Sequence, residues 1–161
     1  MISLSTSSYY YIKRSSIVKR ISFDNRTFYS KFERIDEPLS DLVISQHLAG
    51  DYTVAIPLLH DNHTDKLVIE YKGSNSVRFY HLSRYIIQNF DIAEYIYYRG
   101  YRDDMVVLII SVDRVPIEKA YQMVEDISKA LSAKMTKEWK ILPDINLPLE
   151  YNILVLPYGR L

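Results

Sequence analysis

The run MVVLIISV, residues 105–112, constrains the fold more than any other part of the chain. It is apolar almost without interruption and has the length of a strand, so it predicts a strand that is buried on both faces. Such a strand needs a hydrogen-bonded neighbour on each side and a covering layer. We therefore expect residues 105–112 to be the central strand of a sheet.

The regions around this run alternate between strand and helix patterns. An apolar helical pattern that begins at Pro38 ends at Gly50, and Pro116 begins a longer one. We expect Ser76 to cap the helix between them, with Val77, Tyr80 and Ile87 on its buried side. The expected helices are residues 38–50, 76–90 and 116–135. The expected strands are residues 51–59, 66–72, 93–100, 105–112 and 151–157, the first two forming a hairpin across the turn HDNHTD.

This order of elements predicts an α+β fold with a mainly antiparallel sheet and helices packed against it. Long stretches of the order suit an RRM-like sheet. The length of 161 residues is that of one domain, and 48% hydrophobic and 25% charged residues are typical of a folded globule. We expect a basic and aromatic N-terminal segment, residues 1–35, followed by the α+β domain, residues 36–161.

Charge is distributed unevenly along the chain. The formal net charge is zero, yet residues 1–35 hold seven lysines and arginines against two acidic residues, which favours a polyanionic partner. Three successive tyrosines, Tyr9, Tyr10 and Tyr11, are followed there by two pairs of basic residues, a pattern suited to phosphate contacts with base stacking. The expected phosphate contacts are Lys13, Arg14, Lys19 and Arg20. Alternatively, the segment is an edge strand that docks its tyrosines on the core, or a partly disordered arm.

Several classes of protein are excluded by what the sequence lacks. Zero cysteine excludes disulfides, thiolate metal sites and thiol nucleophiles. No apolar run is long enough to cross a membrane, and no signal peptide pattern begins the chain, so we expect a cytoplasmic protein without a membrane partner. No phosphate-binding loop, dinucleotide glycine fingerprint or Ser-His-Asp arrangement is present.

Four segments in the same order resemble the archaeo-eukaryotic primase-polymerase superfamily, especially its stand-alone primases from mobile elements. They are HLAGDYTVAIPLLHDN, LVIEYKG, YYRGYRDDMVVLII and YNILVLPYG, which together span about residues 46–161. The resemblance implies an RRM-like primase-polymerase core of archaeal or viral origin. It also implies a role in DNA replication.

The family uses two acids on one strand to hold the two divalent metals of nucleotidyl transfer. Glu70 matches the first acid and is the one metal ligand implied here, whereas Lys72 stands at the second. The third acid matches Asp144 or Glu150. Two-metal catalysis with Mg²⁺ or Mn²⁺ is therefore expected only if Glu70 acts with Asp144 or Glu150 in a rearranged site. The alternative for Glu70 and Lys72 is an ion pair on a half-exposed strand.

A turn that holds nucleotide phosphates in the family matches residues 98–102 here. Arg102 stands where the family has a histidine, and arginine still binds phosphate. The expected phosphate and nucleic-acid contacts of this region are Lys72, Tyr98, Arg99, Tyr101 and Arg102. The alternative is a solvated hairpin tip.

Three functions follow from these expectations. The preferred one is a primase-like accessory protein that binds single-stranded nucleic acid or a nucleotide, without nucleotidyltransferase activity and without a cofactor. Its partner would be a subunit of a replication protein. The alternatives are an active primase-polymerase with a rearranged two-metal site, and a structural domain for protein interaction.

Overall fold

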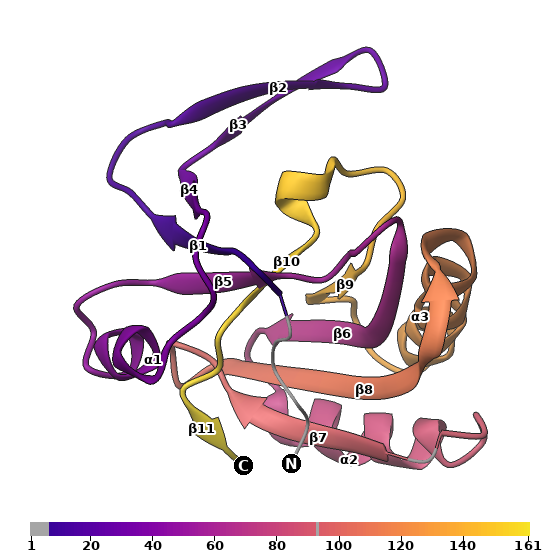
Figure 1. Ribbon diagram of the computed structural model, residues 1–161. Helices are drawn as coiled ribbons and strands as arrows, with labels where there is room; N and C mark the ends of the chain where they lie inside the picture. Colours follow the sequence, from indigo (N-terminus) through magenta and orange to yellow (C-terminus); the bar gives the residue numbers. More distant parts are fainter. Residues whose placement is uncertain (1–6, 93) are drawn as a thin grey trace. The chain divides into compact units, whose positions relative to one another are not determined.

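The computed structural model describes residues 7–92 and 94–161 of the chain. It is an α+β fold in which three α-helices accompany antiparallel sheets (Figure 1). The chain divides into two compact units, residues 1–60 with 145–156 and residues 61–144 with 157–161. This division differs from a boundary after residue 35, because strands before and after that residue pair with each other in the first unit.

The second unit contains a five-stranded sheet and two helices. Its strands lie in the order β11-β7-β8-β6-β9. Along the chain the elements are β6 (His63–Lys72), α2 (Ser76–Ile87), β7 (Glu94–Arg99), β8 (Met105–Pro116), α3 (Ile117–Ser132), β9 (Trp139–Leu142) and β11 (Gly159–Arg160). β8 pairs with both β7 and β6, which confirms the interior strand predicted for residues 105–112.

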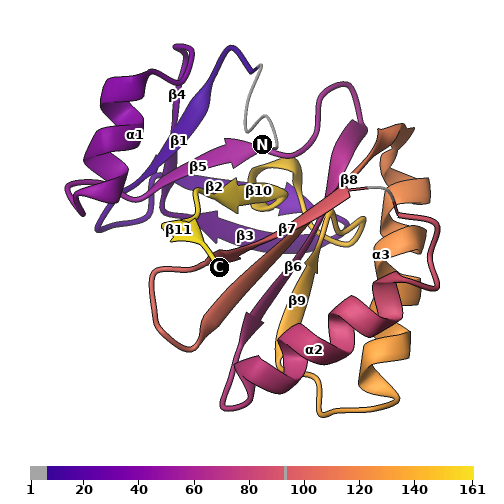
Figure 2. The same cartoon turned by 90° about the horizontal axis from the view of Figure 1, so that it is seen from below.

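Helices α2 and α3 cover one face of this sheet (Figure 2). Alternation along β6 directs Leu67, Ile69 and Tyr71 toward the helices, where all three are fully buried. Buried polar atoms in this layer are paired: Trp139 Nε1 donates to Ser128 Oγ at 2.9 Å. The side chains that alternate with these three along β6, such as Glu70, point to the opposite face of the sheet, which the helices do not cover.

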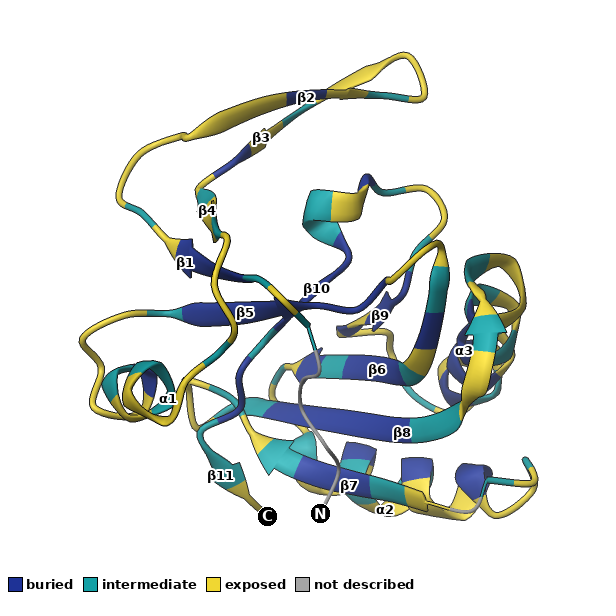
Figure 3. Cartoon of the chain, viewed as in Figure 1, coloured by how far each residue is buried: buried dark blue, intermediate teal, exposed yellow. Residues whose placement is uncertain are grey.

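The first unit contains a four-stranded sheet, a two-stranded ribbon and a short helix. The sheet order is β10-β5-β1-β4, and β2 pairs with β3 in the ribbon. The elements are β1 (Tyr10–Lys13), β2 (Lys19–Phe23), β3 (Arg26–Ser30), β4 (Phe32–Ile35), α1 (Asp41–Leu48), β5 (Val54–Pro57), the 3-10 helix η1 (Leu149–Tyr151) and β10 (Ile153–Val155). Figure 3 shows the contrast in burial between β5, which is buried throughout, and β2, which is mostly exposed.

Helix α1 ends before Gly50 as predicted, but it begins at Asp41, three residues after the predicted start at Pro38. Ser40 Oγ accepts a hydrogen bond from the Val43 amide, and Gly50 follows the helix with a φ of +84°, in the region that favours glycine. His47 is buried and joins three segments of the unit: its Nδ1 accepts from the Val54 amide at 3.0 Å, and its Nε2 lies 2.7 Å from the Leu156 carbonyl oxygen. Since Nδ1 accepts, Nε2 carries the proton and the ring is neutral.

Some predicted details are wrong. β5 and β6 do not form a hairpin, because β5 pairs with β1 and β10 whereas β6 pairs with β8 and β9. Asn75, not Ser76, is the N-cap residue of α2, and Val77 is 68% exposed. Residue 93 of the expected strand 93–100 and residues 1–6 of the expected N-terminal segment lie outside the described residues. Within the described parts of the chain, no helix has the length and apolarity needed to cross a membrane.

Candidate functional site

Glu70 lies in the middle of β6, on the face opposite the two helices. Its Oε2 is 3.3 Å from Lys140 Nζ, and the carboxylate side chain is only 12% exposed. Glu70 and Lys140 are direct partners across β6 and β9. The carboxylate that the sequence predicted as a metal ligand is therefore neutralised by a cross-strand ion pair, with Lys140 rather than with Lys72.

The same face carries further charged and aromatic groups in one row across the sheet. Register pairs Glu70 with Val107, Val107 with Tyr98, and Tyr98 with Arg160. Burial raises the pKa of Tyr98 above its ordinary value, while the positive charge of Arg160 acts in the opposite direction. The row from Lys140 to Arg160 therefore has a cation at each end and one acid between them.

Lys72 and the β7–β8 turn lie together at one end of β6. Lys72 is exposed and faces Met105 in the register, and the Gly73 amide donates to the Asp104 carbonyl oxygen at 3.2 Å. At this turn Arg102 Nη2 pairs with Asp104 Oδ2 at 3.0 Å, and Tyr101 is 59% exposed. Two of the predicted phosphate contacts, Lys72 and Arg102, thus belong to neighbouring backbone segments.

A glycine is required at residue 100 by close packing. A Cβ added to Gly100 would lie 2.7 Å from Met105 Cβ, while the Gly100 amide donates to the Met105 carbonyl oxygen. Tyr98 and Arg99 are adjacent in β7 and therefore point to opposite faces. Arg99 is exposed on the helix side, so it does not share a face with Tyr98.

Asp144 lies toward the other end of β6. The last register pair of β9 joins Leu142 to Val68, and Asp144 follows two residues later on the Lys66 side. Along the direction of β6, Glu70 therefore lies between Lys72 at one end and Asp144 toward the other. No group of three or more histidine, aspartate and glutamate side chains among the described residues could hold a metal ion.

The basic and aromatic segment of the first unit is built into its sheet. Tyr10 and Tyr11 are buried in β1, so these two tyrosines pack in the core as one alternative expected, but β1 lies between β4 and β5 and is not the edge strand of that alternative. The Arg34 guanidinium lies 3.8 Å from the centre of the Tyr9 ring. Arg14 pairs with Glu33 at 2.6 Å, whereas Lys13 is exposed.

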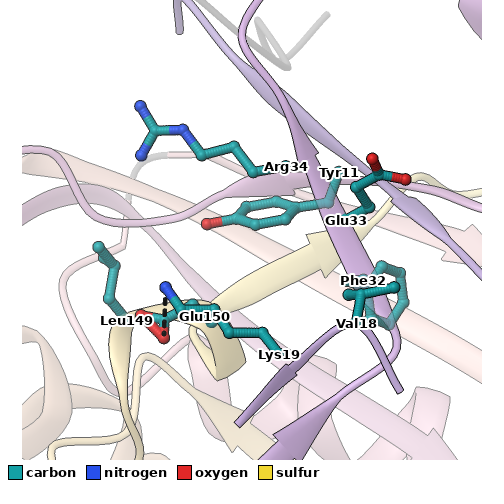
Figure 4. A pocket seen from close by; sticks show the side chains of 8 residues that line it. All are labelled: Tyr11, Val18, Lys19, Phe32, Glu33, Arg34, Leu149 and Glu150. Carbon is teal, nitrogen blue, oxygen red and sulfur yellow. Dashed lines mark ion pairs between the residues drawn. The ribbon is translucent and has the colours of Figure 1, made fainter. Parts of the chain in front are cut away.

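One cavity of the first unit gathers several of these residues (Figure 4). It has a volume of about 390 Å³ and is lined by Tyr11, Val18, Lys19, Phe32, Glu33, Arg34, Leu149 and Glu150. Glu150 Oε2 is buried and accepts no hydrogen bond from a described residue, and Lys19 Nζ lies 3.9 Å away. Burial raises the pKa of Tyr11 to about 12, and the charges of Tyr9 and Glu150 add to the effect. The cavity has the size and polarity for a small ligand with hydrogen-bond donors.

A second cavity, in the second unit, has a volume of about 400 Å³. Asp91, Glu94 and Asp113 contribute acids to its lining, and Lys119 contributes the one cation among the lining residues. No predicted site residue lines it. Its negative charge does not suit a phosphate.

The comparisons with known proteins bear on the first unit. Residues 1–67 match a family described as a domain of unknown function, DUF1882. The matched range holds β1–β5, α1 and the first residues of β6, and excludes β10, the strand that completes the first sheet. No curated protein matches the chain.

Two residues that matter to these surfaces were missed in the sequence. Lys140 was missed because the strand WKIL, residues 139–142, is short, although its alternation was a usable signal. Tyr29 was missed because the pattern of β2 and β3 on either side of Asp24 and Asn25 was not recognised as a hairpin. Asp-Asn between alternating segments was the available signal.

Proposed function

We propose that this protein is a primase-like protein that binds single-stranded nucleic acid and does not catalyse nucleotidyl transfer. It would act as an accessory protein in the replication of a genome or a mobile element. The proposal combines the resemblance in four co-linear segments with the electrostatics of the face that carries Glu70.

The arrangement of the second unit supports an RRM-like core. Its elements run β6-α2-β7-β8-α3-β9, the β-α-β-β-α-β order of split βαβ folds, with both helices on one face. An RRM-like protein contacts nucleic acid through the helix-free face of its sheet. In this chain Val68 and Val107 beside Glu70 on that face are buried, so the exposed groups next to Glu70 there are the cations Lys140 and Lys72. In a primase-polymerase, the same strand region carries the catalytic acids.

The observation that carries the loss of catalysis is the ion pair between Glu70 and Lys140. Two-metal catalysis needs carboxylates that are free to bind divalent ions about 4 Å apart. Here one carboxylate is bound to an ammonium at 3.3 Å, and Lys72, two residues along the same face, adds a second positive charge. Cations at these places repel a divalent metal and favour a phosphate.

The test is a primer-synthesis assay on a single-stranded template with Mg²⁺ or Mn²⁺, run beside a binding assay with the same template. We expect binding without synthesis. Template-dependent synthesis that is abolished in Glu70→Ala would overturn the proposal and establish an active primase-polymerase. Absence of both binding and synthesis at low salt would leave a domain for protein interaction as the function.

A further inference from the structure

The two-stranded ribbon of β2 and β3 has two unlike faces. Arg20 pairs with Tyr29 and Ser22 pairs with Thr27 in the register, so these four side chains share one face. All four are exposed, and Tyr29 is 53% exposed. Of the residues that alternate with them, Ile21 and Ser30 are buried and Phe23 and Phe28 are half-buried, whereas Lys19 and Arg26 at the strand ends are exposed. We call the face with Arg20, Ser22, Thr27 and Tyr29 the outer face of the ribbon.

The other face is anchored to residues 145–151 of the same unit. The rings of Phe28 and Tyr151 meet edge to face at 5.1 Å, and Arg26 donates to the Asn146 carbonyl oxygen. The Tyr151 hydroxyl donates to the backbone carbonyl oxygen of Tyr29. These contacts hold the ribbon through its inner face and leave the Tyr29 ring outside.

A tight turn connects the two strands. Asp24 and Asn25 have φ values of +50° and +58°, the two successive positive values of a type I′ turn. This turn matches the natural twist of a two-stranded ribbon, so the register on its outer face is well defined. The Arg20 and Tyr29 side chains are consequently held as cross-strand neighbours, about 5 Å apart at Cβ.

Positive charge on the outer side of the ribbon is not compensated. Arg20 is exposed, as is Lys31, the residue directly after β3. Neither forms an ion pair with a described residue, whereas Arg14, Lys19 and Arg34 each do. A side chain that is exposed and unpaired is available to a phosphate group at little cost in lost contacts.

We propose that Arg20, Tyr29 and Lys31 form the contact surface for a single-stranded nucleic acid. Arg20 and Lys31 bind backbone phosphates, and the Tyr29 ring stacks on an unpaired base. The inference rests on the proposed function and assigns nucleic-acid binding to the first unit. The stacking ring is Tyr29, which is not one of the tyrosines that the sequence analysis predicted to stack on a base. Ser22 and Thr27 add hydroxyl groups next to this surface.

The composition of the surface favours a single strand over other polyanions. A duplex keeps its bases stacked inside and offers no base face to Tyr29, so a duplex would use only the two cations. An anionic membrane would likewise engage the cations but has no flat partner for the ring. Binding that depends on both the Tyr29 ring and the two cations therefore distinguishes a single strand from a duplex and from a membrane.

The test measures fluorescence anisotropy of a labelled oligothymidylate of about twelve nucleotides, within the site sizes of single-strand binders. The variants are Arg20→Glu with Lys31→Glu, and Tyr29→Ala, in the full chain. Tyr29→Phe keeps the ring, and Tyr29→Ala keeps the backbone carbonyl that Tyr151 uses. Lys129→Glu with Lys137→Glu is the matched control, since both lysines are exposed and lie in the second unit. Circular dichroism verifies that each variant is folded.

We expect the Arg20/Lys31 variant to lose at least about tenfold in affinity and Tyr29→Ala to lose roughly tenfold, from lost phosphate contacts and lost stacking. Tyr29→Phe and the lysine control should bind like the wild type. If the ribbon variants and the control bind equally well, the inference fails while the proposed function stands. If the wild type does not bind at low salt, both fail. If the ribbon variants lose binding to phosphatidylserine vesicles but still bind the oligonucleotide, the surface is a membrane-binding surface and the inference is wrong.

Discussion

At the residue scale, the chemistry of the second unit depends on which charges surround one carboxylate. Glu70 lies on the interior strand β6, where it is paired with Lys140 and followed on its face by Lys72. Two lysines thus account for the proposed loss of metal binding. Replacing them should reverse it.

Lys72→Asp combined with Lys140→Ala should create a weak divalent metal site. The new carboxylate would lie on the same face as Glu70, about 7 Å away along β6, and the competing ammonium would be gone. Titration with Mn²⁺, followed by electron paramagnetic resonance, should detect millimolar binding in this variant and none in the wild type. The control, Lys72→Ala with Lys140→Ala, removes the same two lysines without adding an acid and should show no Mn²⁺ binding. Equal Mn²⁺ binding by the wild type would mean that Glu70 is already a metal ligand.

Tyr11 makes the first unit sensitive to high pH. Burial raises the pKa of Tyr11 to about 12, whereas tyrosine in an unfolded chain ionises near pH 10. Between these values the unfolded chain loses a proton that the folded chain keeps, so the free energy of unfolding falls as pH rises from about 10 to 12. The loss attributable to Tyr11 is about 2–3 kcal/mol.

Urea unfolding at a series of pH values measures this dependence. Tyr11→Phe should make the decline shallower without abolishing it, because burial also raises the pKa of Tyr71 and Tyr97. Tyr101→Phe, at an exposed position, is the control and should leave the decline unchanged. An unchanged slope in Tyr11→Phe would show that this hydroxyl is not protected by the fold.

At the scale of elements, the signals that are local in sequence predicted the structure well. Gly50 ends α1, Pro116 precedes α3, and residues 105–112 form an interior strand, because glycine, proline and apolar runs act on their own neighbourhood. Pairing between distant segments was not predictable in this way. β5 resembled half of a hairpin with β6, yet its partners β1 and β10 come from far along the chain in both directions.

The surroundings of the candidate site residues were not predictable from the sequence for the same reason. Tyr10 and Tyr11 lie close to several cations in a way typical of a binding segment, and only the pairing of β1 with β4 and β5 buries them. Glu70 was found from its motif, but its partner Lys140 required knowledge of β9. The charge pattern therefore indicated a basic segment, and the strand pairing determines which of its residues are buried and which are exposed.

Gly50→Ala tests the local signal that ends α1. The φ of +84° costs an alanine about 1–2 kcal/mol, and no atom lies within 4 Å of the added Cβ, so steric contact adds nothing. Thermal unfolding should show a decrease in Tm of a few degrees, about 2–4 °C for each kcal/mol. Gly159→Ala is the control, because its nearest neighbours are the ends of the Arg99 side chain at 3.8 Å. An equal Tm for Gly50→Ala and the wild type would contradict the argument from φ.

At the scale of the whole molecule, the net charge is zero, but the two units carry different charged features. The first unit carries the ribbon with unpaired cations, and the second carries the helix-backed sheet with its ion-paired acid. The family match over residues 1–67 includes the ribbon and stops near the start of the second unit. The properties proposed for the protein are thus binding in the first unit and an inherited, non-catalytic core in the second.

The central claim is that the protein binds single strands electrostatically and does not extend them. The most direct measurement is the affinity of the wild type for a labelled single-stranded oligonucleotide across a salt series, with Mg²⁺, Mn²⁺ and nucleotides added at the lowest salt. We predict that log Kd rises with log salt with a slope of about 1.4, since two phosphate contacts contribute roughly 0.7 each, and that the oligonucleotide length does not change. Binding that is absent at low salt or independent of salt would contradict the claim, as would extension of the oligonucleotide.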